Sequence, residues 1–430
     1  MAPKRQVLAA RVDQIGGRPV KSAPMAAETT YRCPGETYEI SRSVHLGRLA
    51  GFYPACAECP HREDTGTFSA RRTKLLASVH RHAKKPDSLF DQEGIAGVYL
   101  NEICPEIARR VGQAFGGITF ESWTAKEPPR VFIASDGRPA TAELAAAATD
   151  GLRWAGCEAV DLGPATAPCL AMAAAHHDAA GTIMVGNVRG SLREVSLTFG
   201  GRGGEPISSP GALDAVAETF HSHPPRPARP FGRIERLAIE ADYLNELRPC
   251  FHALRPLKLV IDTTSPALLR YLESLTGSVT ITMERATTGS FDLGRLGARV
   301  RTAKAHFGIW IDGDGEACRV TDEHGEPISA ESLAGLVICA ASDGRSAEQV
   351  LSAGDHDNRE SVRKAMLESR AEFAADRRGR IWFGDCPAAD ALKTLTHLLA
   401  LLSRDDRPLS ERVASAILGG CSAPRRKRRG

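Results

Sequence analysis

The sequence runs Ile309-Trp310-Ile311-Asp312-Gly313-Asp314-Gly315-Glu316 at the end of a predicted strand. Apolar residues pass directly into three carboxylates that are separated by glycines. Glycine at alternate positions lets the backbone fold so that carboxylates at i, i+2 and i+4 converge on one ion, and Mg²⁺ takes oxygen ligands. The stretch therefore predicts a magnesium site formed by Asp312, Asp314 and Glu316. A solvated acidic turn after a buried strand is the alternative.

Similar strand, turn and helix units repeat along the chain. A β-branched run at 131–134 precedes a helical pattern at 140–154, and a run at 259–262 precedes one at 267–275. Residues 182–185 form another such run. Strands that alternate with helices form parallel sheets covered on both faces, with functional groups at the carboxyl ends of the strands. The predicted fold class is therefore α/β.

Composition places the chain among soluble globular proteins of several domains. It has 430 residues, of which 42% are hydrophobic and 25% charged. No apolar run approaches the roughly 20 residues of a membrane helix, and the N-terminus lacks the apolar core of a secretory signal, so we expect a cytoplasmic protein with no membrane partner. The net charge is +3, but residues 425–429 carry five positive charges. The remaining −2 gives no overall bias toward nucleic acid.

Three cysteines are grouped near the N-terminus. Cys33 precedes a Cys-x-x-Cys knuckle formed by Cys56 and Cys59, and His61 follows two residues later. A knuckle of this spacing presents two thiolates to one metal ion, so these four residues predict a tetrahedral Zn²⁺ site. His45 is a rival for the histidine position, and ordinary free thiols are the alternative. The other eight cysteines are scattered among apolar residues, which is typical of reduced thiols in a core.

Five motifs at consistent spacing resemble the α-D-phosphohexomutase family of phosphoglucomutases and phosphomannomutases. They lie at residues 89–97, 134–138, 151–168, 312–325 and 390–411. The resemblance covers residues from about 89 to about 418. It implies three consecutive mutase-like α/β/α domains with mixed or parallel sheets, preceded by a small Cys/His module. It also implies an intramolecular phosphotransferase, or isomerase, that uses a phosphoserine and Mg²⁺ and acts on hexose phosphates.

The predicted division of the chain follows from these patterns. Its segments are a disordered N-terminus (1–30), the Cys/His module (31–85), mutase-like domain I (89–220), a proline-rich linker (221–238), domain II with the acidic loop (239–325), domain III (326–418) and a basic tail (419–430). Too few residues follow the third domain for another one, so we expect the family's fourth, phosphate-binding domain to be absent.

The sequence departs from the family where its chemistry is carried out. Asn187 stands at the phosphoserine position, and an amide cannot accept a phosphoryl group. The family's sugar-binding loop is replaced by residues 375–380, without its glutamate, serine and histidine. Arg378 and Arg380 of that loop are candidates for contacting substrate. Arg138, in the turn after a strand, is a candidate for contacting phosphate.

These departures leave enzymatic activity uncertain. They favour a family member related to carbohydrate metabolism that is catalytically inactive and binds a hexose phosphate or a protein in a regulatory or scaffold role. The first alternative is an active phosphohexomutase or sugar-phosphate phosphotransferase with a non-standard nucleophile, for which Ser191 is the candidate. The second is a nucleic-acid or protein interaction platform that uses the Cys/His module and the basic tail.

Overall fold

The computed structural model describes residues 29–33, 38–51, 53, 56, 59–81, 89–187, 193–222, 227–228, 230–251, 254–276, 281–285, 292–342, 349–351, 358–384 and 386–418. The chain forms two compact units, Met1–Thr73 and Lys74–Gly430. The predictions for the disordered N-terminus before residue 29, for Ser191 and for the basic tail lie outside the described residues.

The first unit contains a short antiparallel pair of strands and a helix. These are β1 (Thr30–Tyr31), β2 (Ile40–Ser41) and α1 (Arg42–Ala50). Ser41 begins the helix, since its side chain accepts a hydrogen bond from the backbone N–H of Val44. A basic helix, α2 (Ala70–Arg81), begins at the end of this unit.

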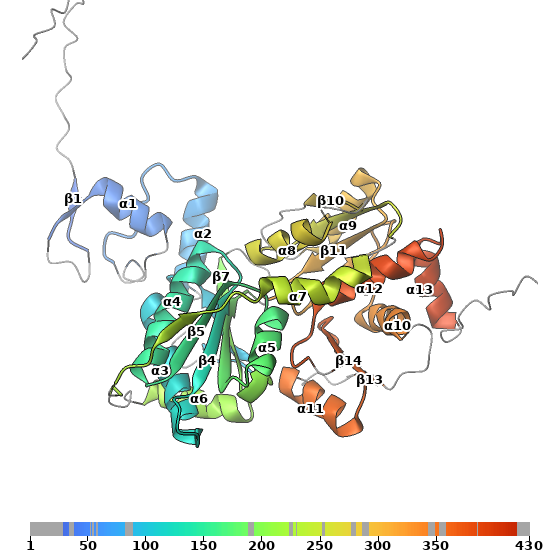
Figure 1. Ribbon diagram of the computed structural model, residues 1–430. Coiled ribbons are helices and arrows are strands. Elements are labelled where there is room, and N and C mark those ends of the chain that lie inside the picture. Colours follow the sequence, from blue (N-terminus) through green and yellow to red (C-terminus); the bar gives the residue numbers. More distant parts are fainter. Residues whose placement is uncertain are drawn as a thin grey trace, which may run out of the picture. The chain divides into compact units, whose positions relative to one another are not determined.

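A six-stranded mixed sheet organises the N-terminal part of the second unit (Figure 1). Its strands are β3 (Gly94–Val98), β4 (Arg130–Ser135), β5 (Glu158–Pro164), β6 (Gly181–Gly186), β7 (Glu194–Gly200) and β8 (Ile234–Arg236), in the spatial order β3-β7-β6-β4-β5-β8. The pairs around β4 and β5 are parallel, whereas β7 is antiparallel to both β3 and β6. The carboxyl ends of β4 and β6 therefore meet at one edge of the sheet.

Helices cover both faces of this sheet (Figure 1). They are α3 (Pro105–Ser122), α4 (Pro139–Trp154) and α6 (Ala212–His221) on one face and α5 (Ala167–His176) on the other. Val131 and Ile133 of β4 join the core beneath α3 and α4, and Phe132 and Ala134 join the core beneath α5. Successive residues of a strand face opposite sides, so an uninterrupted apolar run is what a strand buried on both faces needs.

Two smaller sheets follow. The second has the order β10-β9-β11-β12 and the third β13-β14-β15. Their strands are β9 (Leu257–Asp262), β10 (Ile281–Arg285), β11 (Phe307–Ile311), β12 (Cys318–Thr321), β13 (Gln349–Leu351), β14 (Phe373–Ala375) and β15 (Ile381–Phe383). β11 is parallel to β9 and antiparallel to β12, so the acidic loop at 312–317 is the connection of a hairpin.

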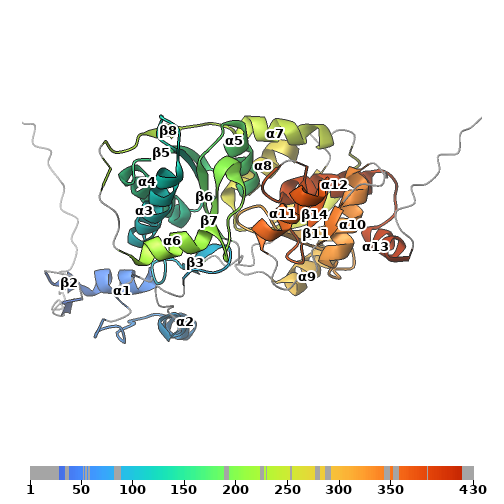
Figure 2. The ribbon, with the colours of Figure 1, turned by 90° about the horizontal axis from the view of Figure 1, so that it is seen from below.

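Helices α7 (Glu240–Leu247), α8 (Pro266–Thr276), α9 (Leu293–Ala303), α10 (Ala330–Ala341), α11 (Arg359–Ser369), α12 (Ala391–Ser403) and α13 (Leu409–Leu418) accompany these sheets (Figure 2). One apolar core runs through all three sheet regions and includes Met184, Ile309, Phe383 and Leu399. Side chains from three distant parts of the sequence can therefore meet at one site.

The structure confirms the α/β class and the strands and helices that the sequence predicts around residues 131–154, 182–185, 259–275 and 308–311. Two expectations change. The segment expected as a linker, 221–238, contains β8, which extends the first sheet beside β5. Cys339, expected as a reduced thiol, is disulfide-bonded. Among the residues described above, none of the helices has the length and apolarity needed to cross a membrane.

Candidate functional site

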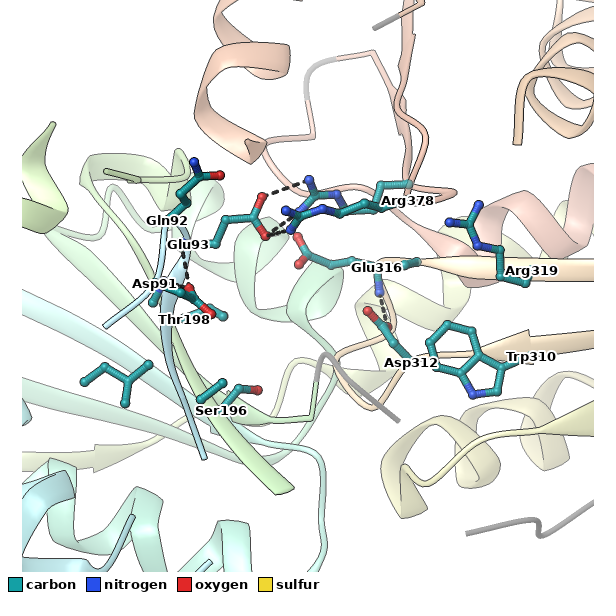
Figure 3. A pocket seen from close by; sticks show the side chains of 15 residues that line it. Asp91, Gln92, Glu93, Ser196, Thr198, Trp310, Asp312, Glu316, Arg319 and Arg378 are labelled. Carbon is teal, nitrogen blue, oxygen red and sulfur yellow. Dashed lines mark hydrogen bonds and ion pairs between the residues drawn. The ribbon is translucent and has the colours of Figure 1, made fainter. Parts of the chain in front are cut away.

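A cavity of about 560 Å³ opens beside the acidic loop (Figure 3). Its walls come from all three sheet regions of the second unit. The lining residues are Asp91, Gln92, Glu93, Gly94, Ile95, Ala96, Ser196, Thr198, Trp310, Asp312, Glu316, Ala317, Arg319, Arg378 and Arg380. This volume lies within the range of small-molecule sites, and the lining is mainly polar and charged.

Two hydrogen bonds join the acidic loop to the end of β6. The backbone N–H of Asn187 donates to Oδ1 of Asp314 at 2.7 Å, and the backbone N–H of Gly313 donates to the carbonyl of Asn187 at 2.9 Å. Glycine is required on both sides. A Cβ on Gly186 would lie 1.8 Å from Asp314 Oδ1, and one on Gly313 would lie 2.9 Å from Asn187 Cβ.

The loop carboxylates are buried together. Asp312, Asp314 and Glu316 are each at most 3% exposed. Within the described part of the chain, Oδ2 of Asp314 has no hydrogen-bond partner. Burial, and then the charge of Glu316, raise the pKa of Asp312 to about 7, and burial and the neighbouring carboxylates raise the pKa of Asp314 well above its usual value. The loop thus brings several carboxylates together in a buried place, where their ionised forms are unfavourable.

A buried guanidinium compensates part of this charge. Arg359, the first residue of α11, donates from Nη1 to Oε2 of Glu316 at 2.9 Å, and both side chains are about 5% exposed. Its Nη2 donates to the carbonyl of Glu93 at 3.0 Å. Arg359 therefore connects the acidic loop to the start of β3.

Glu93 is the centre of a second group of ion pairs. Its carboxylate accepts from Nη1 and Nη2 of Arg380, at 3.0 and 2.9 Å, and from Nη1 of Arg378 at 2.7 Å (Figure 3). Burial alone would raise the pKa of Glu93, but Arg380, Arg359 and Arg378 outweigh it and lower this pKa to about 2. Arg380 also donates from Nε to Asp376 at 2.6 Å. All three of its side-chain nitrogens thus bond carboxylates.

Arg138 holds backbone in place and does not line the cavity described above. Its Nε donates to Asp136 at 2.7 Å, and its Nη atoms donate to the carbonyls of Glu194 and Gly186, both at 3.0 Å. It therefore joins the turn after β4 to the ends of β6 and β7. These contacts position Asn187, which directly follows Gly186.

The donors of the acidic loop fit a hard cation in part. Asp312 and Asp314 offer buried carboxylate oxygens, and Oδ2 of Asp314, which has no hydrogen-bond partner among the described residues, could serve as a ligand atom. Glu316 forms an ion pair with Arg359. Cys33, His45 and Cys59 are the group of described residues whose donor atoms all lie within 4.8 Å of one another. This group is separate from the acidic loop.

This Cys/His group belongs to the first unit, and its histidine differs from that of the predicted zinc site. It contains His45, the rival candidate, in place of His61. The ring of His61 instead packs edge-on against Tyr31, with 5.2 Å between the ring centroids. Cys56 is 98% buried in the same unit.

Of the residues that the sequence singled out, Asp312, Glu316, Arg378 and Arg380 line the cavity, whereas Glu93 and Arg359 were not singled out. Glu93 lies within the motif at residues 89–97, directly before Gly94. Arg359 has no local signal, because its role depends on partners 43 and 266 residues away.

Comparisons with known proteins agree with this architecture. Residues 87–221 match the family model described as phosphoglucomutase/phosphomannomutase, alpha/beta/alpha domain I. A phosphoglucosamine mutase of Staphylococcus epidermidis is 24% identical over 263 residues, which are 57% of this chain and 57% of that protein. The chain thus spans less than two thirds of the length of the curated relatives it matches.

Two solved structures share the fold. A phosphoglucomutase/phosphomannomutase family protein from Burkholderia thailandensis has a TM-score of 0.64 at 21% identity, covering 78% of this chain and 80% of that one. A putative phosphomannomutase from Thermus thermophilus has a TM-score of 0.61 at 16% identity, covering 76% and 83%. At these identities the likeness concerns the fold.

The depressed pKa of Glu93 makes a prediction for acid stability. A lowered pKa in the folded state contributes stability that is present above the unfolded pKa and is lost as pH falls through the folded value. Since that value is about 2 against 4.5, Glu93 should contribute about 3 kcal/mol at neutral pH. Glu93→Gln should therefore be less stable than wild type at pH 7, and the two should converge between pH 4.5 and 2.

Urea unfolding across this pH range measures the difference. Glu368→Gln is the control, because Glu368 is exposed in a surface pair with Lys364 and should leave the curve unchanged. A gap between Glu93→Gln and wild type that does not vary with pH would contradict the ion-pair account.

Proposed function

The chain belongs to the α-D-phosphohexomutase family, and we propose that it binds hexose phosphates in the cavity beside the acidic loop without transferring their phosphoryl groups. In this proposal the protein serves carbohydrate metabolism in a binding, regulatory or scaffold role. The observation that carries the proposal is the place and bonding of Asn187.

Asn187 lies where the family motif predicts a phosphoserine. A phosphoryl acceptor needs a nucleophilic oxygen or nitrogen that can lose its proton to a base, and the amide of Asn187 offers none. The residue is 1% exposed, and its backbone N–H and carbonyl are both bonded to the acidic loop. The loop therefore contacts this position through the main chain, in an arrangement that needs no phosphate.

Arg319 and Arg378 are the best candidates for contacting a substrate phosphate. Both line the cavity; Arg319 is half-buried, and the side chain of Arg378 is 52% exposed. Arg380 is less suitable, since all three of its side-chain nitrogens already bond carboxylates. A guanidinium that keeps accessible N–H groups can bind a phosphate through paired hydrogen bonds.

Asp312 and Asp314 would hold Mg²⁺ in this proposal. When bound, the ion would neutralise negative charge beside the phosphate of a ligand. Glu316 would not complete the ligand set while Arg359 holds it. We therefore expect weaker Mg²⁺ binding than a loop with three available carboxylates would give.

Calorimetric titration combined with a turnover assay tests the proposal. The full chain, given glucose 1-phosphate or mannose 1-phosphate with Mg²⁺ and a hexose bisphosphate, should bind the monophosphate and convert none of it. Arg319→Ala and Arg378→Ala should each weaken binding by roughly tenfold or more, because each removes a charged hydrogen bond worth about 1.5–3 kcal/mol. Arg407→Ala, which changes an exposed arginine paired with Asp405, should leave binding unchanged.

Other outcomes select other functions. Turnover that disappears in Ser191→Ala would establish an active phosphotransferase with a non-standard nucleophile. Neither binding nor turnover, together with RNA binding that is lost on deletion of residues 422–430, would favour the interaction platform.

The ion pair between Arg359 and Glu316 makes a separate prediction. Arg359→Met leaves Glu316 buried and unpaired, which should lower stability by about 3–5 kcal/mol. The freed carboxylate joins those of Asp312 and Asp314, so excess Mg²⁺ should raise the melting temperature of the variant more than that of wild type.

Arg363→Met is the matched control for this experiment. Arg363 lies on the same helix with its side chain 4% exposed, and it pairs with Glu205 instead of the acidic loop. Its loss should destabilise the protein without a gain in the response to Mg²⁺. Equal responses of Arg359→Met and wild type would show that Arg359 does not compete with a metal ion.

A further inference from the structure

Among the described residues of the first unit, the apolar cluster is small. It consists of Tyr31, Cys33, Ile40 and Cys59, so half of its members are cysteines. Units with so small an apolar core generally need a disulfide, a metal ion or a partner to be stable. Cys33, Cys56 and Cys59 are not joined to one another by a disulfide, so no such bond supplies this stability.

The distances in the Cys/His group match a metal coordination sphere. Sγ of Cys33 lies 3.7 Å from Sγ of Cys59 and 3.8 Å from Nδ1 of His45. A tetrahedral zinc ion with Zn–S bonds of about 2.3 Å holds its sulfur atoms about 3.8 Å apart and a sulfur and a nitrogen about 3.6 Å apart. A disulfide would need an S–S distance of about 2.05 Å. The observed spacing is thus the edge of a metal-centred tetrahedron.

The second ring nitrogen of His45 fixes which atom can bind a metal. Nε2 lies 3.2 Å from the backbone carbonyl of Asp64. A carbonyl oxygen only accepts hydrogen bonds, so Nε2 carries the proton and Nδ1 presents its lone pair toward Cys33. Metal-binding histidines usually donate their other N–H to such a carbonyl or to a carboxylate.

Further contacts hold this histidine and its partner in place. The ring of Tyr31 stacks on that of His45, with 4.5 Å between centroids and 17° between planes. The hydroxyl of Tyr31 donates to the carboxylate of Asp64, and Arg42 pairs with the same carboxylate at 2.8 Å. The orientation of the His45 ring is therefore fixed by Tyr31 and Asp64 before any ion binds.

We propose that the first unit binds one Zn²⁺ ion through Cys33, His45, Cys59 and Cys56, and that this ion stabilises its fold. Cys56 lies outside the group of three donors within 4.8 Å of one another, and it is the fourth donor in this proposal because it is buried one turn before Cys59, whose backbone N–H donates to the carbonyl of Cys56. Buried donors without an open position are typical of structural rather than catalytic zinc. His61, packed against Tyr31, is not a ligand.

The test compares variants of two histidines, His45 and His61, in the full chain. Protein purified without chelators should contain one zinc per chain, and X-ray absorption should show three sulfur atoms at about 2.3 Å and one nitrogen at about 2.0–2.1 Å. His45→Ala should lose the zinc during dialysis, whereas His61→Ala should keep it. His45→Cys should keep zinc with four sulfur ligands, which separates loss of a ligand from failure to fold.

Protease protection gives a readout that does not depend on the variants. Chelation should make residues 29–73 sensitive to protease, added Zn²⁺ should restore their protection, and the thermal transition of the second unit should not change. Wild-type protein that binds no zinc even when it is supplied would overturn the proposal. So would zinc that survives in His45→Ala but is lost in His61→Ala, or a disulfide between Cys33 and Cys59 found by mass spectrometry.

Discussion

The carboxylate of Glu93 and the guanidinium groups around it form the interaction on which the site depends. A single buried charge costs several kcal/mol, and breaking a buried pair leaves its partner uncompensated. Glu93 precedes β3, Arg380 follows β14 and Arg359 begins α11, so the pairs join the first sheet to the third. Arg359 also bonds Glu316 in the loop between β11 and β12, so the second sheet is part of the same network. Moving any one of these parts would expose charges that now neutralise one another.

The same network decides what the cavity offers to a ligand. Arg380 could have bound a phosphate, but its donors are already satisfied by Glu93 and Asp376. A metal ion can exchange ligands and bridge a phosphate to the protein, whereas the Arg359 guanidinium is held on Glu316 and on the carbonyl of Glu93. Positive charge is thus present beside the acidic loop, but part of it is fixed in the protein's own structure. What remains for a ligand lies at Arg319 and the exposed side of Arg378.

Local patterns in the sequence predicted the strands, the helices and the acidic loop, because each depends on residues close together in the chain. The side chains of residues 131–134 alternate between the cores on the two faces of the first sheet, as expected for an apolar strand buried on both faces. The pairing of Glu93 with Arg359 could not be read in this way, since both residue types are common and 266 positions separate them. The sequence could not choose between His45 and His61 for a similar reason. Both follow from plausible spacing, and only the turn that brings Asp64 under His45 distinguishes them.

Asn187 links the stability of the site to its chemistry. Its backbone N–H satisfies Asp314, so the acidic loop is held by a bond that is complete before any ligand arrives. Catalysis requires interactions that strengthen on going from the ground state to the transition state. The main-chain hydrogen bond and the ion pair are formed within the protein, and in the proposed function they hold the loop in place for binding. In a site that transfers phosphoryl groups, a side-chain oxygen at this position would accept and release the group. The neighbouring carboxylates would then be available to hold a metal ion that neutralises the charge of the phosphoryl group. This bonding around Asn187 supports the proposal that the site recognises a ligand without converting it.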